Sequence, residues 1–250
     1  MVFGPHDILQ WSGGSWSKWF DGTAAGLAPS GKFKHDIDAV WIPDPAGSVA
    51  WFSFTQNDRI VPGITPKVDG MDVVEWNGTS FAIVFDGQDV GLTNKTQEKI
   101  DALHVLPSSL SPYGGACTNY LLISTQGPGK VPDNSFPPGT INFDGEDVLG
   151  FCQTGVGETT TGYWHVVLDG SQQGMPRNST SSIDFSADGL TMYLTTDKTF
   201  NVDSAVGGHS MVYTYDFLTE EFDGPIFIAA NNGLHVKVDA LHYEEAPPIP

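Results

Sequence analysis

Basic residues are scarce in this chain. Its 250 residues include 11 Lys and Arg against 30 Asp and Glu, which gives a formal net charge of -19. A surface with this field repels a phosphate backbone, so we expect no nucleic-acid partner and no anionic membrane surface. Bound cations or a cationic partner are the complements that such a charge favours, although acidity also serves solubility in a salty or extracellular medium.

Long apolar runs and helical periodicity are also missing. No apolar run approaches 18 residues, so we expect no membrane insertion. The first residues, MVFGPHDILQW, lack a basic region followed by a long apolar stretch, so we expect no signal peptide there. Apolar residues do not recur with a period of 3.6, and 29 Gly and 17 Pro further oppose helix. The predicted fold class is all-β.

Several catalytic motifs are absent as well. The sequence contains no Gly-x-Ser-x-Gly, no His-Glu-x-x-His and no phosphate-binding loop, which gives no support to a serine hydrolase or a zinc site. A pair of carboxylates for glycoside hydrolysis stays open, because spacing along a sequence does not report separation in space.

What the chain does contain is a short motif in four copies. Each copy has Ile or Val followed by Asp at the head of an apolar run: DIDAVWI (36–42), KIDALHVL (99–106), SIDFSAD (182–188) and KVDALHY (237–243). Repeats spaced by several tens of residues favour a repeat architecture. Short β-branched and aromatic runs follow each of the first three copies, at 191–196, 210–215 and 225–229 after the third copy for example, so each repeat is predicted to hold four strands.

The two chain ends complement each other within one repeat. The fourth copy supplies only a first strand, and the N-terminal residues supply the second (1–3), third (7–11) and fourth (16–20). This pattern predicts a single four-bladed β-propeller over residues 1–245, with the last blade closed by both termini. The blades span about 35–88, 99–170, 182–230 and 237–245 plus 1–22, and 246–250 is a Pro-rich tail or the start of a linker. A β-sandwich of four repeats is the structural alternative.

A second motif recurs between repeats, as FDGTAAGL (20–27), FDGQDVGL (85–92) and LDGSQQGM (168–175). A second acidic set is Asp69-Gly-Met-Asp72 and Asp144-Gly-Glu-Asp147, with Asp7 at the matching place near the N-terminus. Acids that flank a glycine could chelate calcium at a blade edge, but Asp-Gly steps are more often turn formers, because both residues tolerate the backbone angles of turns. The turn interpretation is preferred.

The two cysteines, Cys117 and Cys152, fall at neighbouring ends of adjacent predicted strands. We therefore predict a disulfide and an oxidising compartment, with two free buried cysteines as the alternative. Three sequons, at Asn77, Asn94 and Asn178, would be glycosylated if the source is a secreting eukaryote.

The Ile-Asp-Ala head that begins a strand resembles the hemopexin-like four-bladed propellers, in which a similar Asp-Ala head begins each innermost strand. That resemblance implies backbone carbonyls that point into a central channel and hold calcium or sodium. The hemopexin-type disulfide between the first and last blades is absent here. The combination of FDGxxxGL turns, DIDA heads and a Val-Pro-Gly loop also resembles repeats of bacterial secreted proteins of unassigned function.

In a propeller the four head aspartates, Asp38, Asp101, Asp184 and Asp239, would ring one mouth of the channel. Carboxylates, backbone carbonyls and water are ligands that suit calcium. The alternative is that each aspartate caps the backbone of the next blade and fixes its register. His104 and His242 also share one repeat position, and this repetition favours a structural role for them.

The leading hypothesis is a non-catalytic extracellular or cell-surface module that binds or scaffolds a protein or glycan partner, with a cation in its channel. One alternative is a polysaccharide hydrolase or lyase that uses the carboxylates at the channel mouth. Another is a structural subunit that forms homo-oligomers, a surface filament or a matrix.

Overall fold

The computed structural model describes residues 3–27, 35–65, 67–134, 137–175, 177, 180–209 and 211–232. Within these residues the chain is all-β, with antiparallel pairing in every sheet and only short 3-10 turns besides, and this confirms the predicted fold class. No helix in this part of the chain is long and apolar enough to cross a membrane.

Three four-stranded sheets account for most of the structure, and in each of them the strands follow one another outward in chain order. The first sheet is β3 (Ile37–Trp41), β4 (Ala50–Phe54), β5 (Val73–Trp76) and β6 (Phe81–Phe85). The second is β7 (Ile100–Leu106), β8 (Asn119–Thr125), β11 (Val148–Gly155) and β12 (Thr161–Leu168). The third is β13 (Thr180–Phe185), β14 (Thr191–Thr196), β17 (Met211–Asp216) and β18 (Glu221–Ile228).

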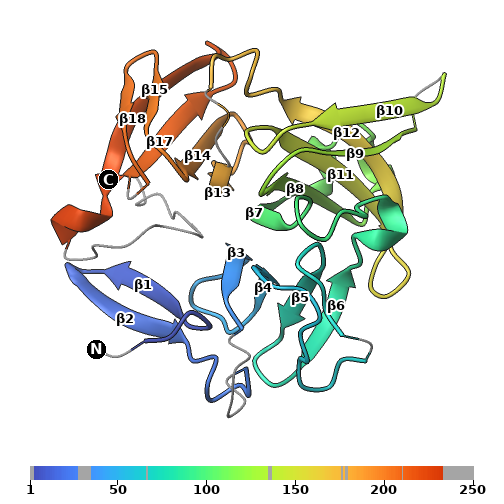
Figure 1. Cartoon of the computed structure of the whole chain (residues 1–250). Helices are drawn as coiled ribbons and strands as arrows, with labels where there is room; N and C mark the ends of the chain where they lie inside the picture. The colour runs from blue at the N-terminus through green and yellow to red at the C-terminus, as the bar shows by residue number, and fades with distance from the viewer. Residues whose placement is uncertain are drawn as a thin grey trace.

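The three sheets are arranged around a common centre, with β3, β7 and β13 innermost (Figure 1). These three strands contact one another. A hairpin of β1 (Ile8–Ser12) and β2 (Ser15–Phe20) lies beside the first sheet. The expected first strand at 237–243 and residues 1–2 of the expected second strand lie outside the described residues, and Phe3 is not in a strand.

Two short hairpins were not predicted. The first, β9 (Gly129–Asp133) with β10 (Gly139–Phe143), is inserted between β8 and β11 and packs against β12. The second, β15 (Phe200–Val202) with β16 (Ala205–Gly207), is inserted between β14 and β17. The remaining elements are single 3-10 turns: η1 (Gln88–Val90), η2 (Ser108–Leu110), η3 (Gly114–Ala116) and η4 (Ala229–Asn232).

The core lies between neighbouring sheets. One cluster joins the first and second sheets around Phe85, Phe151 and Trp164, and another joins the second and third around Leu122 and Tyr213. Strands that are covered on both faces need apolar side chains at nearly every position. All five residues of β4 are accordingly buried, which explains its continuous run Ala-Trp-Phe-Ser-Phe.

Each sheet is tied to the next by the same backbone hydrogen bond, which we call the joint. The acceptor is always the carbonyl two residues before the aspartate that precedes a third strand, and the donor is an N–H at the head of the following first strand. The three joints are Ile37 N to Pro5 O at 2.9 Å, Ile100 N to Gly70 O at 2.9 Å and Thr180 N to Gly145 O at 2.7 Å.

The aspartate beside each joint binds backbone on both sides. One carboxylate oxygen accepts from the N–H three residues earlier, and the other accepts from the glycine N–H of the Asp-Gly step after the fourth strand. The bonds of Asp7 go to Gly4 (2.8 Å) and Gly22 (3.0 Å), those of Asp72 to Asp69 (2.8 Å) and Gly87 (3.2 Å), and those of Asp147 to Asp144 (2.8 Å) and Gly170 (2.9 Å). These aspartates hold turns, as the turn interpretation expects.

The glycine of the Asp-Gly step is required by close approach. A Cβ on Gly22, Gly87 or Gly170 would lie 2.0, 2.3 or 2.6 Å from a backbone carbonyl oxygen of the loop that carries the joint. The second glycine of the motif, at Gly26, Gly91 or Gly174, has a φ of 88°, 105° or 77°, where other residues are strained. The FDGxxxGL motif is therefore explained by packing and turn geometry.

Asp72 gives this arrangement a pH dependence. Burial is the main reason why the pKa of the Asp72 carboxyl is raised from 3.8 to about 7. The charges of Asp86 and Asp69 also act to raise this pKa, whereas hydrogen bonds from backbone N–H groups act to lower it. The folded state then binds more protons between these two values, so this carboxyl's contribution to stability falls as pH rises through that window. We expect the stability of wild type relative to Asp72→Asn to fall by about 2 kcal/mol between pH 5 and pH 7, measured by urea unfolding. A constant difference across that range would contradict the raised pKa.

Candidate functional site

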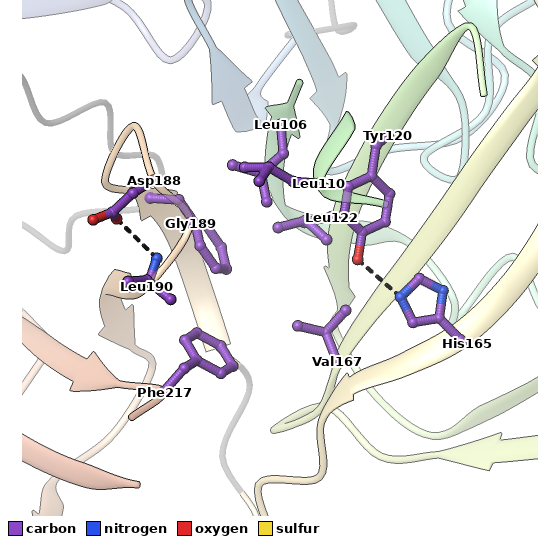
Figure 2. Close-up of a pocket in the computed structure, with 11 residues that line it drawn as sticks. Leu106, Leu110, Tyr120, Leu122, His165, Val167, Asp188, Gly189, Leu190 and Phe217 are labelled. Atoms are coloured by element: carbon purple, nitrogen blue, oxygen red, sulfur yellow. Dashed lines mark hydrogen bonds between the residues drawn. The ribbon is translucent and has the colours of Figure 1, made fainter. Parts of the chain in front are cut away.

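A pocket of about 350 Å³ lies between the second and third sheets (Figure 2). The second sheet and the loop after β7 contribute Leu106, Leu110, Leu122 and Val167, with Tyr120 and His165. The third sheet and its turns contribute Phe185, Leu190 and Phe217, with Asp188 and Gly189. Most of the lining is apolar, and its volume is near the lower end of the range for ligand sites.

Two adjacent turns form the third sheet's side of the pocket. Phe217 N donates to Leu190 O at 2.9 Å, which joins the turn after β17 to the turn after β13. Asp188 fixes the latter turn, because one of its oxygens accepts from Ser186 Oγ at 2.7 Å and from Leu190 N at 3.0 Å. Figure 2 shows the bond from Leu190 N. These bonds lower the pKa of the Asp188 carboxyl, with the Ser186 hydroxyl as the larger cause. A negative charge therefore stands at the pocket.

The polar part of the pocket is a Tyr–His pair on the second sheet. Tyr120 Oη and His165 Nε2 are 2.8 Å apart, and the rings stack with centroids 5.5 Å apart. Burial lowers the pKa of His165 and raises that of Tyr120, with a smaller effect from Tyr113 on the latter, so both groups are neutral at pH 7. His165 Nδ1 is buried without a hydrogen-bond partner among the described residues.

Gly150 on β11 makes room for this pair. A Cβ at this position would lie 2.3 Å from His165 Cε1 and 2.9 Å from Tyr120 Oη. A glycine inside an apolar strand often marks such a close approach. The glycine within the apolar run Val-Leu-Gly-Phe-Cys at 148–152 is thus a signal in the sequence for this close approach.

We expect Gly150→Ala to displace the His165 ring and to cost about 2 kcal/mol of stability, since overpacking a filled site forces side chains from their preferred rotamers. A double-mutant cycle with His165→Ala separates this clash from a general effect on β11. With the ring removed, adding Gly150→Ala should cost little more by urea unfolding. Additive costs would mean that the ring and Gly150 are not coupled.

Aromatic side chains extend the site along the outermost strand of the second sheet. The Tyr113 ring lies 5.5 Å from that of Tyr163 and 5.6 Å from that of His165. Tyr113 Oη donates to Trp164 O at 3.0 Å, and Asn134 Nδ2 donates to Gly162 O at 3.4 Å. Side chains therefore cap two carbonyls of β12, which lies at the edge of its sheet.

The part of the chain that forms the pocket is strongly acidic. Between residues 100 and 236 the sequence has 15 Asp and Glu but only three basic residues, Lys130, Arg177 and Lys198. None of the three lies in the strands and turns that line the pocket.

Two of the predicted cation ligands, Asp38 and Asp101, directly follow the joint donors Ile37 and Ile100. Asp184 lies four residues after the joint donor Thr180, so it is not at the equivalent place on its strand. Asp38, Asp101 and Asp184 are buried on β3, β7 and β13. Asp38 Oδ2 accepts from Gln126 Nε2 at 2.9 Å, and Asp184 Oδ1 is 2.6 Å from His104 Nδ1. No group of three or more His, Cys, Asp or Glu in the described residues could hold a metal ion. Asp239 and His242 lie outside those residues, so the cation site stays a prediction.

The other predicted positions are on the surface or between strands. Cys117 and Cys152 are joined by a disulfide with Cα atoms 5.0 Å apart, which is consistent with the expectation from their places in the sequence. Of the sequon residues, Asn77 and Asn94 are exposed, and Asn178 lies outside the described residues. A disulfide-bonded β domain fits an extracellular protein.

Comparisons with protein-family models, with curated proteins and with solved structures give no match for this chain. Its function therefore has to be argued from the geometry of its own residues.

Proposed function

We propose that this chain is a non-catalytic binding module built on a four-bladed β-propeller and presented outside the cell or at its surface. The three repeated joints and the mutual contacts of β3, β7 and β13 support the propeller. The fourth blade of this proposal includes the β1–β2 hairpin, and the copy of the motif at 237–243 that would complete it lies outside the described residues. Gly208, which matches Pro5, Gly70 and Gly145 in the repeat, would accept the fourth joint.

The pocket between the second and third sheets is the observation that carries the binding function. Its walls are apolar, and the Tyr120 hydroxyl and His165 Nε2 satisfy each other. Such a pocket binds an apolar group by removing its surface from water. A sugar would need several further hydrogen-bond partners, so a protein side chain is the better occupant. The disulfide supports the extracellular setting.

Titration with a neutral apolar fluorophore, N-phenyl-1-naphthylamine, tests this function. We expect saturable binding at one site and about tenfold weaker binding to Leu190→Ser, because that change removes an apolar wall of the pocket. Ile60→Ser is the matched control, because Ile60 is also an exposed apolar residue but belongs to the first sheet's loops. Equal affinities for the two variants would count against the pocket, and so would the absence of saturable binding.

A cation held near the head aspartates is the second part of the proposal, with calcium preferred and sodium as the alternative. Its support is the burial of Asp38, Asp101 and Asp184 on the three innermost strands. A ligand that binds only the native state raises the unfolding midpoint. We expect excess calcium to raise the midpoint relative to chelator, and Asp101→Asn to abolish that shift. An unchanged midpoint in wild type would reduce these aspartates to register-fixing residues.

A further inference from the structure

We propose that the pocket receives a leucine or phenylalanine side chain from a lysine- or arginine-rich segment of a partner protein. This inference rests on the proposed binding function and adds the chemistry of the partner. Three features carry it: the apolar lining, the exposed leucines beside the pocket, and the acidic charges in the strands and turns that line it.

The apolar surface continues outside the pocket. Leu218 follows Phe217 and is 73% exposed, while Leu190 and Leu110 at the pocket are 39% and 40% exposed. Hydrogen bonds fix the two turns that carry Leu190 and Leu218, since Phe217 N donates to Leu190 O and Leu218 N donates to the Asp216 side chain at Oδ1, at 2.7 Å. Apolar side chains held outward on ordered turns are typical of a contact surface for another protein.

The charged residues in the strands and turns that line this pocket are all acidic. Asp188 lines the pocket, Asp216 holds the turn of Leu218, and Glu220 and Glu221 follow that turn on the surface. The elements that line the pocket carry no lysine or arginine. Complementary charges speed association and exclude partners of the wrong sign. An acidic or neutral segment gains nothing from this field, whereas a basic segment can place its cations over Asp188 and Glu220 while an apolar side chain fills the pocket.

Three synthetic hexapeptides test the inference on the whole protein. The first has a central leucine and phenylalanine flanked by two lysines on each side, the second replaces the lysines with glutamates, and the third keeps the lysines around two serines. Binding is measured by calorimetry and by displacement of N-phenyl-1-naphthylamine. At low salt we expect the first peptide to bind at least about tenfold more tightly than either of the others and to displace the fluorophore. Its advantage over the glutamate peptide should shrink at high salt, because exposed charges are screened.

A double variant tests the charges without altering any residue that lines the pocket. Glu220→Gln with Glu221→Gln should weaken the first peptide about threefold or more and leave the fluorophore's affinity unchanged, because both residues are exposed and neither lines the pocket. Thermal unfolding verifies that the variant is folded. Glu158→Gln is the control. Glu158 is exposed in the turn that precedes β12, and its neighbour Gly157 pairs with Phe85 of the first sheet.

Failure of the inference and failure of the proposed function give different results. If the fluorophore binds but the lysine and glutamate peptides bind equally well, the charge argument is overturned and the binding function stands. Equal binding of the serine peptide would overturn the role of the pocket in peptide recognition. If chitohexaose displaces the fluorophore and the first peptide does not, the partner is a glycan. If neither the fluorophore nor any peptide binds, both proposals are wrong.

Discussion

Replacing both cysteines, as Cys117→Ser with Cys152→Ser, is expected to lower the free energy of unfolding by about 4 kcal/mol. The disulfide closes a loop of 35 residues by sequence separation, and the chain-entropy model assigns that cost to the freedom regained by the unfolded chain. The loop contains the whole of β8 and the β9–β10 hairpin, so the bridge links the start of one core strand to the middle of the next.

Urea unfolding of wild type and the double variant, both without reductant, measures this cost. Reductant should bring wild type to the stability of the variant and leave the variant unchanged, which controls for effects of the serines themselves. Equal stabilities of the oxidised wild type and the variant would mean that the bridge adds nothing to the native state.

Substituting Gly87 is expected to have the next largest effect. A Cβ there would lie 2.3 Å from the backbone oxygen of Met71, which belongs to the loop that holds the joint between the first and second sheets. Backbone cannot move away as a flexible side chain can, so Gly87→Ala should cost about 3 kcal/mol. It should also weaken the hydrogen bond from Gly87 N to Asp72 Oδ1.

Gly115→Ala is the matched control for this substitution. A Cβ at Gly115 meets nothing within 4 Å, and this residue does not have a positive φ. Chemical denaturation should find the control within the small range of ordinary surface substitutions. If the two alanine variants lost equal stability, the close approach would not be the reason for glycine at position 87.

The sequence predicted most strands well because their runs are apolar and are bounded by turn residues. The strand expected at 191–196 agrees with β14 at both ends. The hairpin of β9 and β10 was missed because it contains Pro132 and few buried side chains. The strand expected to begin at Pro225 begins instead at Glu221. Gly and Pro usually mark turns, but here Gly224 and Pro225 lie inside β18.

The pocket was beyond the sequence for a different reason. Tyr120 and His165 are far apart in the chain, and their pairing depends on the register of β8, β11 and β12 around Gly150. Leu190 and Phe217 come from separate turns whose contact is a backbone hydrogen bond, which no side-chain pattern reveals. The repeated positions, by contrast, were visible because they serve the fold in every repeat.

The joint between sheets is made only by backbone atoms, Ile100 N and Gly70 O being one example. Such a bond tolerates a change of side chain at the donor, as the threonine at position 180 illustrates where other copies have isoleucine. Divergence between the repeats is then restrained mainly where a glycine must leave space or an aspartate must bind backbone. Duplicated repeats of this kind can diverge in sequence until they share only these glycine and aspartate positions. The spacing of Asp and Gly would then be the remaining sequence evidence that the repeats have a common origin.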